Sequence, residues 1–212
     1  MKTILIPTNF TDVARHATDY AIRLYHGQLK RIILLNAFEQ PRTGRSIQFS
    51  LLEILRKNSE KGLIEDKLRI EEEFPGSGID IVLKATQGDL SSSIKSVLVD
   101  TQVDLIVMGS KGDEEFLDMI VESVTARVIR NVEHPMLIVP PVADITKLNT
   151  IALATDLKKI TNEGILKEMK DLCVQPGAKV EVFHVSKGIP NENPENEKML
   201  SALLGEISHS FS

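Results

Sequence analysis

The sequence predicts a doubly wound α/β fold, in which a five-stranded parallel sheet has helices on both faces and is followed by a partial second copy. Two observations predict it. Short apolar runs alternate along the chain with longer segments whose apolar residues recur at helical spacing, the pattern of right-handed crossovers between parallel strands. The start of the pattern then recurs, because Ile-Leu-Ile-Pro-Thr-Asn at 4–9 is echoed by Ile-Ala-Leu-Ala-Thr-Asp at 151–156.

Five strands are expected in residues 1–141. Each is a short apolar run, and the first and last of these runs are bounded by proline, which cannot continue a central strand. Mostly continuous apolar character, rather than alternation, favours parallel strands that are buried on both faces. The expected strands are Thr3–Pro7, Ile32–Ala37, Ile79–Leu83, Asp104–Met108 and Pro135–Val139.

Helices are expected between these strands. The first has Thr11 or Asp12 as its possible N-cap and Gly27 as its stop. In the second, Gly62 leaves open whether the segment forms one long helix or a broken pair. The expected helical segments are Val13–Leu24, Ile47–Phe74, Asp89–Thr101 and a fourth marked by Ile120, Val124, Val128 and Ile129.

The chain length fits one and a half domains, at roughly 150 residues per domain. Residues 142–149 are expected to be a linker, and residues 150–212 a truncated copy of residues 1–141. On this interpretation the copy has a strand–helix–strand opening and ends before a second glycine loop and last strand. Its expected elements are strands at Thr150–Thr155 and Lys179–Val185 and helices at Ile160–Cys173 and Met199–Ile207.

Composition disfavours several classes of protein. A content of 42% hydrophobic and 26% charged residues is typical of a globular protein with a sizeable core. The formal net charge of −5 argues against nucleic-acid binding driven by positive charge. No apolar run approaches the roughly 18 residues that span a membrane, and the N-terminus does not read as a signal peptide. With its single cysteine, which fits a reducing compartment, the protein is expected to be cytoplasmic.

A glycine loop carries the most specific signal. Val107–Gly112 reads Val-Met-Gly-Ser-Lys-Gly, and nine residues separate it from Glu122-Ser123. This segment resembles the signature of the universal stress protein family: a strand ending in glycine, two residues, glycine, nine residues, then Gly-Ser or Gly-Thr. Residues 4–11 and 134–139 look like the family's first and last strands. The resemblance covers residues 1–141 well and 148–212 in part, and implies a tandem member with strand order 3-2-1-4-5 in an adenine-nucleotide alpha hydrolase-like fold.

The resemblance also implies an adenine-nucleotide pocket at the carboxyl ends of the strands, where open parallel sheets bind ligands. Family members with the full motif bind ATP there, and the acid after their first strand contacts the adenosine portion. The positions that the resemblance assigns to this pocket are Pro7, Thr8, Asn9, Ala37, Met108, Gly109, Lys111, Gly112, Glu122, Ser123 and Val124.

Two of these positions depart from the family pattern. Glu122 replaces the third motif glycine and places a carboxylate where a phosphate would approach. Asn9 replaces the first-strand acid and cannot accept two ribose hydroxyls as a carboxylate does. Further acids precede Glu122, and like charges 4 Å apart repel by roughly 4 kcal/mol at an effective dielectric constant of about 20. These acids could instead simply complement the dipole of the following helix. We expect ATP or AMP to bind weakly or not at all.

The expected function is therefore a non-catalytic stress-response regulator with a degenerate nucleotide pocket. The alternatives are an ATP- or AMP-binding sensor and a slow ATPase. No catalytic or metal-binding residue is expected, since the sequence has no nucleophile elbow, eight-residue phosphate loop or metal-ligand histidine pair. In the implied strand order Met136–Val139 lies at an edge, and an unpaired edge favours association. A homodimer through this strand is expected, with protein partners rather than nucleic acid or membrane.

Overall fold

The computed structural model describes residues 1–39, 48–110, 123–144, 150–155, 171–172, 179–184, 198, 200–202, 204–205 and 208–211. The chain divides into two compact units, Met1–Asp144 and Ile145–Ser212. Each unit has a sheet of its own, and the two are described separately.

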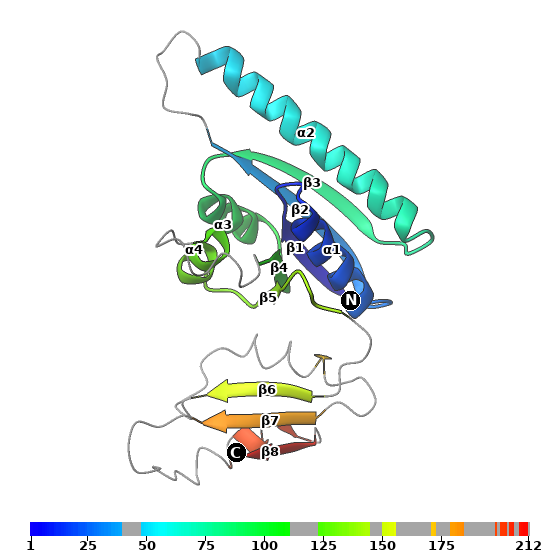
Figure 1. The fold of residues 1–212 in the computed structure, drawn as a ribbon, viewed down its shortest axis with the longest axis vertical. Helices are drawn as coiled ribbons and strands as arrows, with labels where there is room; N and C mark the ends of the chain where they lie inside the picture. Colours follow the sequence, from blue (N-terminus) through cyan, green and yellow to red (C-terminus); the bar gives the residue numbers. More distant parts are fainter. Residues whose placement is uncertain are drawn as a thin grey trace. The chain divides into compact units, whose positions relative to one another are not determined.

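The first unit is a five-stranded parallel sheet with a helix in each crossover (Figure 1). Its strand order is β3-β2-β1-β4-β5, which confirms the predicted 3-2-1-4-5 order and the doubly wound fold. The strands are β1 (Lys2–Pro7), β2 (Leu29–Phe38), β3 (Asp80–Gln87), β4 (Leu105–Gly109) and β5 (Met136–Val139). The helices are α1 (Asp12–Leu24), α2 (Gln48–Glu73), α3 (Leu90–Asp100) and α4 (Val124–Asn131).

Helices cover both faces of this sheet, with α1 and α2 on one side and α3 and α4 on the other (Figure 1). One core cluster joins Leu5, Ile33 and Ile106 of the strands to Ile94 of α3 and Val128 of α4. Because side chains alternate along a strand, the intervening strand residues face α1 and α2. Burial on both faces explains why the strand sequences are continuously apolar.

Capping side chains set where three of the helices begin. Thr11 accepts a hydrogen bond from the Ala14 N–H and is the N-cap of α1, which agrees with the sequence. Asp89 caps α3 and Ser123 caps α4, each by accepting an N–H three residues on. These caps fix the residues at which α1, α3 and α4 begin.

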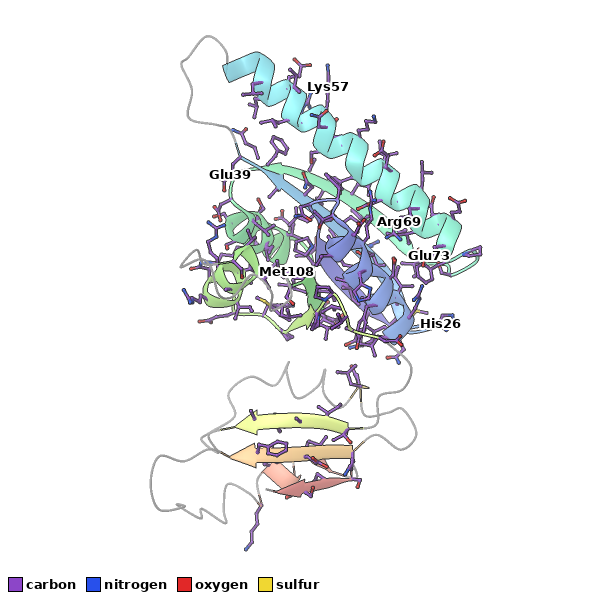
Figure 2. All side chains as sticks on the ribbon, in the orientation of Figure 1. His26, Glu39, Lys57, Arg69, Glu73 and Met108 are labelled. Carbon is purple, nitrogen blue, oxygen red and sulfur yellow. The ribbon has the colours of Figure 1, made fainter. Side chains whose placement is uncertain are left out.

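The long second helix is continuous, so the single helix is the correct alternative for this segment. Gly62 does not break it, and the Phe10 ring accounts for the missing side chain: an added Cβ would come within 2.6 Å of Phe10 Cζ. Ion pairs bind α2 to α1, with 2.9 Å between Arg15 Nε and Asp66 Oδ1 and 2.9 Å between Arg69 Nη1 and Asp19 Oδ1. Figure 2 shows Arg69 beside Glu73, its second acidic partner.

The second unit holds three parallel strands in the order β6-β7-β8. They are β6 (Thr150–Thr155), β7 (Lys179–His184) and β8 (His209–Phe211). The first two match the predicted strands. The third corrects the strand–helix–strand prediction, because a three-residue His-Ser-Phe strand gives no apolar run to detect. The described residues 171–172, 200–202 and 204 are helical and lie within the predicted helices, and residue 198, just before the second of these, is helical as well. Apart from Gly205, which lies in a turn, the rest of the two predicted segments is outside the described residues.

Candidate functional site

The strand order reverses at the carboxyl ends of β1 and β4. From there β1 leads through α1 to β2 on one side, and β4 leads through α4 to β5 on the other. The two strands pair at Ile4–Leu105 and Leu5–Ile106, yet β1 continues to Pro7 and β4 to Gly109. Ligands of open α/β sheets bind outside the strand ends at such a switch point. The described part of the predicted site is grouped around these ends.

Gly109 is a glycine because α1 begins directly against it. An added Cβ would lie 2.6 Å from Val13 Cγ1 and 2.8 Å from the Val13 carbonyl oxygen, so any side chain would push the first turn of α1 away from β4. The Thr125 hydroxyl donates to the Gly109 carbonyl over 3.0 Å. Gly109 therefore brings the first turns of α1 and α4 to the end of β4.

Thr8 joins three elements at the end of β1. Its N–H donates to the Leu35 carbonyl (2.8 Å), and its own carbonyl accepts from Asn36 Nδ2 (2.7 Å), which ties it to β2. Its hydroxyl donates to Asp66 Oδ2 over 3.2 Å and accepts from the Phe10 N–H over 3.0 Å. The hydroxyl of this buried residue thus links α2 to the loop that follows β1.

Asn9 is exposed, and its side-chain oxygen is already engaged. Asn9 Oδ1 accepts from the Thr11 hydroxyl (2.7 Å) and from the Thr11 N–H (3.4 Å). The backbone N–H can only donate, so it fixes which amide atom faces Thr11. The exposed group that remains is the Nδ2 amide, a hydrogen-bond donor. A carboxylate at this position would instead present acceptors to a ligand.

The other predicted positions have different environments. Met108 belongs to the core between the sheet and helices α3 and α4, so its side chain is not part of a ligand surface. Ala37 pairs with Thr86 in a stretch of β2 that runs beyond the end of β1. Ser123 is exposed, and its hydroxyl accepts the Ala126 N–H over 3.1 Å. Val124 is half exposed, whereas Pro7 is buried. Lys111, Gly112 and Glu122 lie outside the described residues.

Sequence reasoning missed Asp66. The carboxylate is 4% exposed and binds both Arg15 and Thr8. A signal for it exists in the sequence, because Leu63, Asp66 and Ile70 recur at helical spacing and all three are buried. A charged residue on the inner stripe of a helix needs a partner, and the partners here are Thr8, directly after β1, and Arg15 of α1. Asn36 also supports this corner of the site, because its Nδ2 amide donates to the Thr8 carbonyl.

The described part of the chain contains no group of three or more His, Cys, Asp or Glu side chains that could hold a metal ion. In the same residues, no helix is both long and apolar enough to cross a membrane.

Known proteins resemble this chain chiefly over its first unit. A model described as the universal stress protein family matches residues 1–140. Universal stress protein MJ0577 of Methanocaldococcus jannaschii is 28% identical over 154 residues, which cover 65% of this chain and 94% of that protein. Universal stress protein Sll1654 of Synechocystis sp. is 30% identical over 139 residues, 66% of this chain and 85% of that protein.

Solved structures share the fold. The structure of MJ0577 covers 66% of this chain and 95% of its own, with 27% identity and a TM-score of 0.53. The structure of a universal stress protein from Archaeoglobus fulgidus covers 99% of this chain and 75% of its own, with 17% identity and a TM-score of 0.71. The matched family model, the similar sequences and the shared strand order agree: the chain belongs to the universal stress protein family.

Proposed function

We propose that this protein is a non-catalytic, cytoplasmic stress-response regulator whose first unit keeps the frame of an adenine-nucleotide pocket without holding ATP tightly. The observation that carries the proposal is the state of Asn9. Its oxygen is engaged by Thr11, so a donor stands where the family pattern has an acidic acceptor. Support for a retained frame comes from the close approach of Gly109 to α1 and from the Ser123 cap of α4.

The sequence adds a second obstacle to phosphate binding. Glu122 occupies the third glycine of the family motif. A carboxylate 4 Å from a phosphate charge opposes binding by roughly 4 kcal/mol at an effective dielectric constant of about 20. A lost hydrogen bond to a charged group weakens binding by a further amount of about 1.5–3 kcal/mol. Either term alone reduces affinity by an order of magnitude or more.

Restoring the family residues tests this proposal. The double variant Asn9→Asp with Glu122→Gly should gain binding of ATP–Mg, seen as an upward shift of the thermal unfolding midpoint that the unaltered protein lacks. A ligand at 100 times its Kd stabilises by about 2.7 kcal/mol. A matched control is Asn131→Asp with Glu133→Gly, which makes the same two exchanges near the opposite end of α4. Equal stabilisation of the unaltered protein and the double variant would contradict the proposal.

A second candidate function uses the same site. The intact frame around Gly109 and the exposed Ser123 favour an ATP- or AMP-binding sensor, or a slow ATPase, in which both departures are tolerated. Phosphate release that is lost in Ser123→Ala but kept in Asp89→Ala would support the ATPase. Asp89→Ala is the matched control because it removes the same kind of cap from α3. A nucleotide-dependent thermal shift without phosphate release would support the sensor.

We further propose that the protein is a tandem member of the family with an incomplete second domain, 150–212, joined to the domain 1–141 by a linker at 142–149. Support comes from the order β6-β7-β8, which repeats β1-β2-β3 of the first unit. The Archaeoglobus structure, whose fold matches 99% of this chain and extends beyond it, agrees with such an arrangement. We also propose a homodimer through β5, a strand at the edge of the described sheet.

A further inference from the structure

The Asp66 carboxylate lies where α2 meets both α1 and the loop after β1. Its Oδ1 accepts from Arg15 Nε over 2.9 Å, and its Oδ2 accepts from the Thr8 hydroxyl over 3.2 Å. The side chain of Asp66 is 4% exposed, while that of Arg15 is 36% exposed. A carboxylate so far from solvent depends on these two donors for its hydrogen bonds.

The Thr8 hydroxyl passes this constraint to the loop. Because the hydroxyl donates to Asp66, its lone pairs face the Phe10 N–H, from which it accepts over 3.0 Å. Phe10 has a φ of +64°, and among the described residues it is the one non-glycine residue with a positive φ. Side chains disfavour this conformation, and such residues persist when their surroundings hold them.

Phe10 is held by α2 at two points. Its N–H is bound, through Thr8, to Asp66, and its ring lies against Gly62. Residues four apart lie on the same face of a helix, so Gly62 and Asp66 together form one contact surface for the loop. Between Thr8 and Phe10 lies Asn9, whose direction is therefore set from α2 as well as from Thr11.

We infer that Asp66 is a positioning residue for the loop after β1, so that α2 determines how Asn9 faces the candidate site. The inference deepens the proposed function. It rests on that function in one respect, the position at which a ligand would bind. The loop geometry itself does not require a nucleotide. A change in the docking of α2 should alter the Asn9 loop, and a ligand held by Asn9 should by linkage favour the present docking of α2.

A purely structural role for Asp66 is the competing explanation, and the chain contains a matched control for it. Asp19 also joins α1 to α2 through an arginine, with 2.9 Å between Arg69 Nη1 and Asp19 Oδ1. Among the described residues, the Asp19 carboxylate accepts hydrogen bonds from Arg69 of α2 and from no residue of the loop. Removing either carboxylate takes away an ion pair between the same two helices. Only the removal of Asp66 also takes away the hydrogen-bond acceptor of the Thr8 hydroxyl.

Amide hydrogen exchange measured by nuclear magnetic resonance tests the inference without any ligand. The readout is the exchange rate at Phe10 divided by that at Ala126, whose N–H is capped by Ser123 in α4. In Asp66→Leu and in Thr8→Val, this ratio should rise about five- to tenfold, the effect expected of one lost hydrogen bond. In Asp19→Leu and in Thr8→Ser, which keeps the hydroxyl, it should stay unchanged.

Two results would overturn the inference: an unchanged ratio in Asp66→Leu, or an equal rise in Asp19→Leu. Thr8→Val removes the acceptor of the Phe10 N–H itself, so it calibrates the size of the rise. Where Asp66→Leu does not fold, Asp66→Ala and Asp19→Ala give the same comparison. Since exchange is measured on the free protein, a failure of the nucleotide proposal leaves this test valid, and a failure here leaves the nucleotide proposal intact.

Discussion

At the end of β1, Asn9 turns its side-chain oxygen toward Thr11 and leaves its amide group exposed. The neighbouring Thr8 and Phe10 are held by α2. Asn9 was identified from the sequence because it stands in a motif, whereas Asp66 was not, because its partners lie 58 and 51 positions away. Sequence motifs identify residues that act within one strand–loop segment. Contacts between residues far apart in the sequence can be identified only once the fold is known.

One prediction at this scale concerns Gly62. Glycine to alanine in a helix interior ordinarily stabilises by about 1 kcal/mol, but here the new Cβ would meet the Phe10 ring at 2.6 Å. Gly62→Ala should therefore lower the free energy of unfolding, measured by urea denaturation. In a Phe10→Ala background the same exchange should raise it by about 1 kcal/mol. If alanine stabilises equally in both backgrounds, the Phe10 ring does not lie on Gly62.

The sequence predicts the strands well where both faces of the sheet are buried. All five strands of the first unit were predicted, because residues facing either helical layer are apolar. The strand order came from the family resemblance rather than from the residues. The sequence left the Gly62 helix undecided, since local propensity does not include the Phe10 ring, which arrives from the loop after β1. It missed β8 because three residues give no periodicity.

A prediction at this scale concerns the start of α3. Hydrogen bonds from Ser92, first from its side chain and then from its backbone N–H, lower the pKa of Asp89 below its ordinary value of 3.8. A carboxyl group whose pKa is lower in the folded than in the unfolded state stabilises the fold at pH values above its unfolded-state pKa. This stabilisation is lost as the pH falls through the folded-state pKa. Asp89→Ala should cost about 1 kcal/mol at pH 7. The difference from the unaltered protein should shrink at pH values below 3.8, as measured by urea denaturation; a constant difference would contradict a charged cap.

For the whole molecule, the proposed assembly centres on β5. The Ile106 N–H donates to the Pro135 carbonyl and the Ser110 N–H to the Val139 carbonyl. In a parallel ladder, alternate residues bond to each neighbour, so residues 135, 137 and 139 bond to β4. Met136 and Ile138 then present their backbone groups to the outer edge of the described sheet.

The proposed homodimer therefore has a specific test. Ile138→Pro removes an N–H that faces outward while leaving the bonds to β4 in place. Light scattering after size exclusion at micromolar concentration should give a dimer for the unaltered protein and a monomer for Ile138→Pro, with similar circular dichroism spectra. A monomer in both cases would contradict pairing through β5.

We propose that the first unit keeps the architecture of the family's nucleotide site but does not hold ATP tightly. Isothermal titration calorimetry of the unaltered chain with ATP–Mg tests it most directly. We predict no saturable heat at protein concentrations of tens of micromolar. Stoichiometric binding with a Kd of about 1 µM or tighter, equivalent to about 8.2 kcal/mol or more, would contradict the claim and show that Asn9 and Glu122 are compatible with a working nucleotide site.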